Sequence, residues 1–229
     1  MRYEFVHSYE FVVRREFMNL LIFGPQGCGK GTQADKLSEK HNLVHVETGY
    51  IFRKIGEKDT PLGKKIKEIN EKREMIPDDI LVDILKSKLE KIPAEKGLIL
   101  DSAPRLTSQI EIIEKMLANL GRSVDKAISI TLPREESIAR ISKRYICPAC
   151  NKQFVLGENI QSKNDPCPEC GGPIRQRLDD TPDGITKRLN TFQEVTVPVI
   201  EHYRQKGMLI EVDGRKGADE VFEDITKQL

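Results

Sequence analysis

The sequence has no excess of charge of either sign, no long hydrophobic run and only four histidines. Lysine and arginine number 37 against 36 aspartate and glutamate residues, so the formal net charge is +1. This balance argues against a broad nucleic-acid-binding or membrane-binding surface, and any bound phosphate must be held by local clusters of charge. No apolar run approaches the ~20 residues that a membrane-spanning helix needs. We therefore expect neither nucleic acid nor a membrane as a partner.

The N-terminal segment also lacks the apolar centre of a signal peptide. Residues 1–17 carry charges throughout, which predicts a cytoplasmic protein. They precede the first predicted strand, and Met18 would itself make a sensible chain start. We interpret residues 1–17 as an extension with little fixed structure, to which the sequence assigns no role.

Short apolar segments that suit buried strands alternate along the chain with helical patterns. The predicted strands are 19–23, 43–46, 97–101, 127–132 and 208–212. The predicted helices are 30–40, 80–89, 109–120, 134–143, 184–204 and 218–229. Such alternation is typical of βαβ units, and it predicts an α/β fold whose parallel sheet is covered by helices on both faces.

Two segments interrupt this alternation and are interpreted as insertions into the core. Residues 47–77 are charged and helical, whereas residues 144–178 are rich in proline, glycine and cysteine. The core would then consist of residues 18–46, 78–143 and 179–229.

A glycine-rich loop follows the first strand and opens the first helix. Its glycines (Gly24, Gly27, Gly29 and Gly31) let successive backbone N–H groups curl around a phosphate. Lys30 adds a charge for the β- and γ-phosphates of a nucleoside triphosphate, and the helix N-terminus adds its dipole. In the general P-loop pattern a serine or threonine follows the lysine directly, but here Gly31 intervenes before Thr32. Cys28 is interpreted as a small residue at a variable position.

Four of the five cysteines form two C-x-x-C pairs, Cys147/Cys150 and Cys167/Cys170. Two such pairs match the tetrahedral coordination of Zn²⁺, although iron accepts the same four thiolates. Disulfides are a poorer interpretation for a cytoplasmic chain. With four protein ligands the metal has no open position, so we expect a structural centre that staples about 30 irregular residues.

The Gly-Lys-Gly-Thr ending of the loop resembles the adenylate kinase family, and further segments continue the resemblance in family order. HVETGYIFRKI (45–55) resembles T-G-x-x-x-R, and DSAPRLTSQ (101–109) resembles D-G-F-P-R-T-x-x-Q. IARISKRYIC (138–147) resembles the entry to the family's lid, RQRLDDTPDGITKRL (175–189) its R-x-D-D segment, and TVPVIEHY (196–203) its T-x-P-L-I-x-Y-Y. The resemblance covers nearly the whole chain from residue 19. It implies a monomeric enzyme that transfers a phosphoryl group reversibly from ATP to AMP, giving two ADP, with Mg²⁺.

The same resemblance implies a set of site residues. The catalytic residues would be Lys30, Asp101, Arg105, Arg144, Arg177 and Arg188. ATP would be bound by Gly24, Gly27, Gly29, Lys30, Gly31, Thr32, Arg140 and Arg144, and AMP by Thr48, Arg53, Arg105 and Gln109. Asp101 would orient Mg²⁺ through water, and Asp179 with Asp180 would hold the lid arginines or a metal-bound water. An arginine-rich site suits this chemistry, because the acceptor is already an anion and needs no general base.

Three positions depart from the family pattern, so the sequence leaves open which nucleoside monophosphate is the acceptor. Tyr50 stands where aspartate is usual, Ser102 where glycine is, and Ala103 where phenylalanine is. A kinase for another nucleoside monophosphate or with GTP as donor is one alternative. A non-catalytic nucleotide-binding zinc-ribbon protein is another, although residues 151–166 carry little of the basic and aromatic character that nucleic-acid binding would need.

The two insertions carry arginines for one reaction centre and must also admit two nucleotides. We therefore expect residues 47–77, as an NMP-binding insert, and residues 144–178, as a lid, to close over bound nucleotides. The expected hinges lie near Glu47, Pro77, Lys143 and Leu178.

Overall fold

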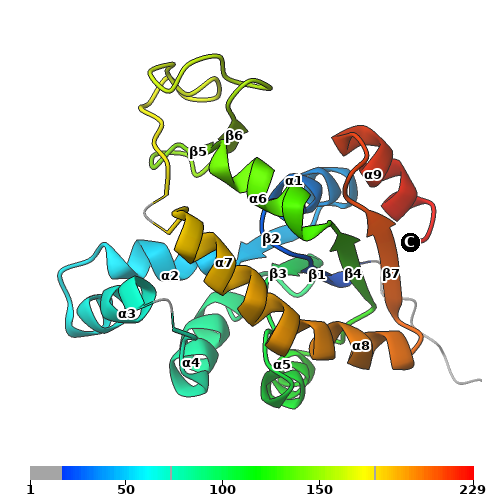
Figure 1. Ribbon diagram of the computed structural model, residues 1–229. Coiled ribbons are helices and arrows are strands. Elements are labelled where there is room, and N and C mark those ends of the chain that lie inside the picture. Colours follow the sequence, from blue (N-terminus) through cyan, green and yellow to red (C-terminus); the bar gives the residue numbers. More distant parts are fainter. Residues whose placement is uncertain (1–16, 73, 178) are drawn as a thin grey trace, which may run out of the picture.

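The computed structural model describes residues 17–72, 74–177 and 179–229, and in that part of the chain five strands form one sheet. The strands are β1 (Asn19–Phe23), β2 (Val44–Glu47), β3 (Leu98–Asp101), β4 (Lys126–Thr131) and β7 (Leu209–Asp213). Their order is β2-β3-β1-β4-β7, and neighbouring strands run parallel (Figure 1). The prediction of an α/β fold with a parallel sheet is confirmed.

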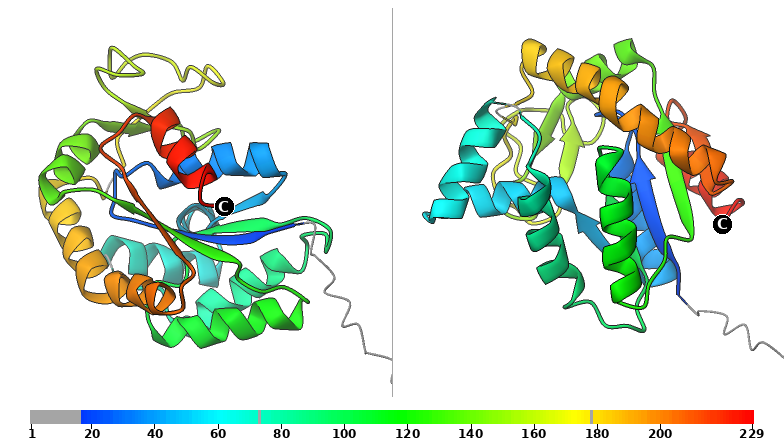
Figure 2. Two further views of the ribbon diagram at one scale, coloured as in Figure 1. Left: turned by 90° about the vertical axis from the view of Figure 1, so that its right-hand side faces the viewer. Right: turned by 90° about the horizontal axis from the view of Figure 1, so that it is seen from below.

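Helices cover both faces of this sheet (Figure 2). On one face lie α1 (Lys30–His41) and α9 (Ala218–Thr226), and on the other lie α4 (Asp78–Leu89), α5 (Ser108–Asn119) and α8 (Val197–Gln205). Every residue of β1 is buried. Leu20 and Ile22 belong to one hydrophobic cluster, whereas Leu21 and Phe23 belong to the other. This alternation explains why a central strand reads as a continuous apolar run.

The predicted helix over 184–204 is divided in the structure. It comprises α7 (Pro182–Thr191), a π-helical segment η1 (Phe192–Thr196) and α8. Pro198 lies two residues after the end of η1. It has no N–H to donate, and its ring conflicts with a carbonyl one turn earlier. The wider π turn is the local adjustment that lets the helix continue across this proline.

The remaining elements lie outside the sheet or beside the P-loop. Residues 48–72 form α2 (Thr48–Gly56) and α3 (Pro61–Lys72), and α6 is Arg134–Ser142. β5 (Arg144–Ile146) and β6 (Gln153–Val155) pair antiparallel, above the sheet in Figure 1. Within the described chain, no helix has the length and apolar character to span a membrane. Of the expected extension, residues 1–16 lie outside the described chain, as does the expected hinge at Leu178.

Candidate active site

The P-loop connects β1 to α1 through backbone conformations that favour glycine. Gly27 has φ 80° and Gly29 has φ 92°, both in the left-handed region. A Cβ at Gly24 would lie only 2.5 Å from the carbonyl oxygen of Ile130. Gly31 and Thr32 fall in the first turn of α1, whose N-terminus carries the positive end of the helix dipole. The loop is thus built as a cradle for an anion.

The ammonium group of Lys30 lies over this loop. Its Nζ donates to the carbonyl oxygens of Gly24 (2.7 Å) and Pro25 (3.0 Å). The thiol of Cys28 is buried beneath it, and burial raises the pKa of that thiol although Lys30 opposes the shift. Cys28 therefore stays protonated and serves as packing.

The arginines expected to bind AMP lie together at the start of α2. A Cβ at Gly49 would lie 3.1 Å from Nη1 of Arg53 and 4.0 Å from Nη2 of Arg105. Burial lowers the pKa of both guanidinium groups, and Arg177 lowers each further by repulsion. An anion bound between them would relieve this repulsion. The two side chains are thus brought together as the sequence predicted.

The residues expected to bind the acceptor base, Thr48 and Gln109, form hydrogen bonds with other residues of the protein. The Oε1 of Gln109 accepts from the backbone N–H of Arg105 at 2.8 Å, and its Nε2 donates to Asp78 Oδ1 at 2.7 Å. Thr48 Oγ1 donates to the carbonyl oxygen of Asp101 at 2.9 Å. Both side chains belong to buried residues. Their contact with a base stays a prediction, and Gln109 would have to exchange Asp78 for the base.

On the other side, three arginines surround two adjacent carboxylates. Arg177 and Arg188 contact Asp179 at 2.7 and 2.6 Å, and Arg144 and Arg188 each contact Asp180 at 2.6 Å. Burial alone would raise the pKa of Asp179, but Arg177 and Arg188 lower it to about 2. The cluster keeps a surplus of positive charge, as a phosphate site requires.

Arg140 lies beside the P-loop, where the donor nucleotide was expected. Its Nη1 donates to the carbonyl oxygen of Gly214 at 2.8 Å. A Cβ at Gly27 would lie 3.4 Å from the Cβ of Arg140. Its guanidinium is therefore fixed next to the loop.

Asp101 ends β3 next to the P-loop and is 5 % exposed. Ser102, which has φ 64°, donates its hydroxyl to Asp101 Oδ1 at 2.7 Å. The sequence assigned no role to His45, yet its Nε2 lies 3.6 Å from Asp101 Oδ2 and its Nδ1 2.9 Å from Asp35 Oδ1. Burial opposes protonation, but these two carboxylates raise the pKa of His45 to about 9. The strand register brings the two residues together, since His45 pairs with Ile99, two positions before Asp101, and this register is not visible in the sequence.

Residues 148–152, in the segment predicted to be a lid, contact α1, β2 and α2. Lys152 Nζ lies 2.6 Å from Asp35 Oδ2, and Asn151 Nδ2 donates to Glu47 Oε2 at 2.7 Å. Lys54 Nζ donates to the carbonyl oxygen of Pro148 at 3.3 Å. No local sequence pattern predicts these contacts, since they join segments about 100 residues apart.

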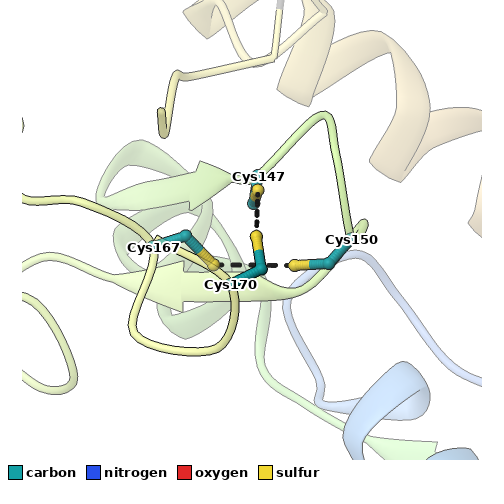
Figure 3. Close-up of side chains that lie close together, drawn as sticks. All are labelled: Cys147, Cys150, Cys167 and Cys170. Carbon is teal, nitrogen blue, oxygen red and sulfur yellow. Dashed lines mark hydrogen bonds between the residues drawn. The ribbon is translucent and has the colours of Figure 1, made fainter. Parts of the chain in front are cut away.

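The four paired cysteines converge in the lid (Figure 3). Their sulfur atoms lie within 4.8 Å of one another, and Cys147–Cys170 and Cys150–Cys167 are each separated by 3.5 Å. Tetrahedral Zn²⁺ with bonds of about 2.3 Å requires sulfur–sulfur distances of roughly 3.8 Å, so the donor set fits. The cluster could bind a metal, and the cysteines are not paired as disulfides.

A family model described as adenylate kinase matches residues 22–208. An adenylate kinase of Kosmotoga olearia is 41 % identical over 213 residues, which cover 93 % of this chain and 99 % of the relative. An adenylate kinase of Archaeoglobus fulgidus is 38 % identical over 208 residues, which cover 91 % and 96 % of the two chains. One of Methanocella arvoryzae is 40 % identical with the same coverage. With the P-loop and the arginine cluster in place, these matches show that the chain belongs to the adenylate kinase family of nucleoside monophosphate kinases.

Proposed function

We propose that Lys30 and five arginines perform the adenylate kinase reaction of this chain, reversible phosphoryl transfer from MgATP to AMP. The observation that carries this assignment is the gathering of the arginines: Arg144, Arg177 and Arg188 contact Asp179 and Asp180, and Arg53 and Arg105 lie together beside Gly49. Burial is the main cause that lowers the pKa of Arg53, Arg105 and Arg144, and repulsion from Arg177 adds to it. So many mutually repelling charges indicate a site built for several phosphates.

On the donor side, backbone N–H groups of residues 26–31 and the ammonium of Lys30 would hold the β- and γ-phosphates. Arg144, Arg177 and Arg188 would meet the charge that spreads over the transferred group in the transition state. Arg140 would lie against the donor base. Thr32 would complete the phosphate contacts from the first turn of α1.

On the acceptor side, Arg53 and Arg105 would hold the AMP phosphate from two sides. The attacking phosphate oxygen is already ionised, so it needs positioning and no general base. Thr48 and Gln109 would bind the base after rearrangement of their present hydrogen bonds.

Asp101 is suited to holding the hydrated Mg²⁺ that accompanies the nucleotide. Its carboxyl is buried, but His45, Lys30 and Ser102 lower its pKa, so it stays ionised. Mg²⁺ would supply charge neutralisation between donor phosphates. In the lid, Cys147, Cys150, Cys167 and Cys170 would hold Zn²⁺, with iron as the alternative, in a structural role.

The proposed division of the chain is a core (18–46, 78–143 and 179–229), an NMP-binding insert (47–77) and a lid (144–178). The positions of α2, α3 and the β5–β6 hairpin outside the sheet support it. A cytoplasmic location and a monomeric state stay predictions.

A coupled assay of each common nucleoside monophosphate with ATP and with GTP tests the substrate assignment. We expect the highest kcat/KM for AMP with ATP. Preference for a pyrimidine monophosphate would instead trace to Tyr50, Ser102 and Ala103. Absence of turnover with every pair would favour the non-catalytic nucleotide-binding alternative.

A further inference from the structure

The two cysteine loops of the lid have the same pattern of backbone hydrogen bonds, but they carry different residues at one equivalent position. In the first, the N–H of Asn151 bonds to Cys147 O (2.8 Å), and the N–H of Cys147 bonds to Lys152 O (3.0 Å). In the second, the N–H of Gly171 bonds to Cys167 O (2.8 Å), and the N–H of Cys167 bonds to Gly172 O (2.7 Å). The equivalent residues, Asn151 and Gly171, both have left-handed backbones, with φ of 61° and 72°.

A left-handed position favours glycine, and asparagine is the next best tolerated side chain. Since Gly171 shows that glycine satisfies this loop, the loop itself does not require the asparagine. The side chain of Asn151 does make a contact outside the loop: its Nδ2 donates to Glu47 Oε2 at 2.7 Å. This contact is a reason for asparagine at a position where glycine suffices for the fold.

Glu47 in turn connects the lid to the acceptor site. It ends β2, and its side chain is 20 % exposed. While Oε2 accepts from Asn151, Oε1 accepts from Arg53 Nη2 at 2.8 Å. The two oxygens of one carboxylate are therefore shared between the lid and the arginine assigned to the AMP phosphate.

We propose that Asn151 and Glu47 are positioning residues that couple lid closure to binding of the acceptor phosphate. With the lid down, Asn151 holds the carboxylate of Glu47 in one orientation, and Glu47 holds Arg53 in the orientation that receives AMP. With the lid raised, Glu47 loses this donor and Arg53 is less restrained. Because binding linkage is reciprocal, a donor nucleotide that closes the lid tightens AMP binding, and AMP favours closure equally. This inference rests on the proposed roles of Arg53 and of the lid.

Asn151→Gly tests the coupling, because it removes the amide and keeps the left-handed loop as Gly171 has it. AMP affinity is measured by calorimetry on the metal-loaded protein, alone and with a non-hydrolysable ATP analogue. We expect the variant to lose less affinity for AMP alone than for AMP in the presence of the analogue, because the analogue holds the lid closed. The tightening produced by the ATP analogue should fall about three- to tenfold, the factor that one net hydrogen bond supplies.

Asn42→Gly is the matched control, since Asn42 is also left-handed (φ 52°) but caps α1 on an exposed surface. It should leave the coupling unchanged. In a Glu47→Ala background, Asn151→Gly should have no further effect on the coupling, because its action passes through Glu47. An unchanged coupling in Asn151→Gly overturns the inference, as does an equal loss of AMP affinity with and without the analogue. Both are binding measurements, so a wild-type protein that couples the two sites but transfers no phosphoryl group contradicts the proposed function alone.

Discussion

Lys30 is the charged side chain of the P-loop. Its ammonium group donates to the backbone carbonyls of Gly24 and Pro25 and contacts the thiol of Cys28. We expect Lys30→Met to lower kcat by about 10³ or more, because a transition-state contact is lost. The thermal unfolding temperature should stay close to that of the wild type. Lys36→Met on the same helix removes an ion pair with Asp219 and a contact with the ring of Phe222, both away from the P-loop, and should keep its activity. Near-normal turnover in a folded Lys30→Met protein would defeat the P-loop assignment.

Arg53 and Arg177 are expected to act at different stages of the reaction. Arg53→Ala should mainly raise the KM for AMP, by about tenfold or more, because it removes a contact to a ground-state phosphate. Arg177→Ala should lower kcat at saturating substrates by about 10²–10³, because it removes charge that matters most in the transition state. Steady-state kinetics separates the two effects. Identical patterns would mean that one of the two roles is wrongly assigned.

His45 gives the protein a pH dependence in the neutral to basic range. Its pKa is raised from 6.5 to about 9 in the folded state. The stabilisation is therefore complete below pH 6.5 and is lost as the pH rises through 9. With allowance for partial solvent exposure, the free energy of unfolding should fall by about 2–3 kcal/mol over this range.

Urea unfolding of the wild type and His45→Gln at several pH values checks this expectation. The variant should be less stable at neutral pH and should lack this part of the pH dependence. Parallel curves for the two proteins would show that the contacts to Asp35 and Asp101 do not survive in solution.

At the scale of single elements, we expect the proposed lid, residues 144–178, to depend on a bound metal for its stability. Its hydrophobic cluster is small, with five buried residues: Cys147, Phe154, Ile160, Cys167 and Ile174. Two of these are metal-binding cysteines, so apolar burial alone gives the segment little stability.

Purified protein should hold about one equivalent of a thiolate-bound metal, which elemental analysis measures. Cys150→Ser should lower the metal content, lower the unfolding temperature and expose residues 144–178 to protease. Cys28→Ala is the control: it removes a cysteine from the P-loop and should leave the metal content unchanged. Freshly prepared, reduced wild-type protein without any bound metal would overturn the assignment.

The elements that sequence predicts well are those whose signals are local. β1 reads as an apolar run because both of its faces are buried, and the P-loop reads directly from its glycines and Lys30. The predicted strands lie within one or two residues of the observed ones. η1 was not predicted, because a π turn depends on how the chain accommodates Pro198.

Contacts between distant segments could not be predicted in the same way. Gln109 is matched by its motif, yet its present partner, Asp78, lies on another helix. His45 is significant because it contacts Asp35 and Asp101, and Asn151 because it donates to Glu47. Such pairs depend on tertiary packing, which the local pattern around either residue does not contain.

At the scale of the whole molecule, donor and acceptor phosphates should lie side by side. An analogue with two adenosines joined by phosphates should therefore bind far more tightly than ATP or AMP, because one ligand uses the contacts of both sites. It should also protect residues 144–178 from protease, since closure is favoured only by contacts made in the closed form. Calorimetry and limited proteolysis measure both effects. An analogue that binds no better than ATP would separate the two sites and contradict the kinase mechanism.

The strand order also has a consequence for folding of the chain during its synthesis on the ribosome. β1 emerges before the other four strands of this sheet, yet it lies between β3 and β4, and β7 forms the edge beyond β4. Its apolar side chains remain unpaired until β3 and β4 have been synthesised, because parallel neighbours are joined only through long crossovers. A nascent chain stopped before Leu209 would leave β4 as an open edge able to pair with other chains. The P-loop is thus synthesised before the strands that flank β1, and it can acquire its final shape only after they have joined the sheet.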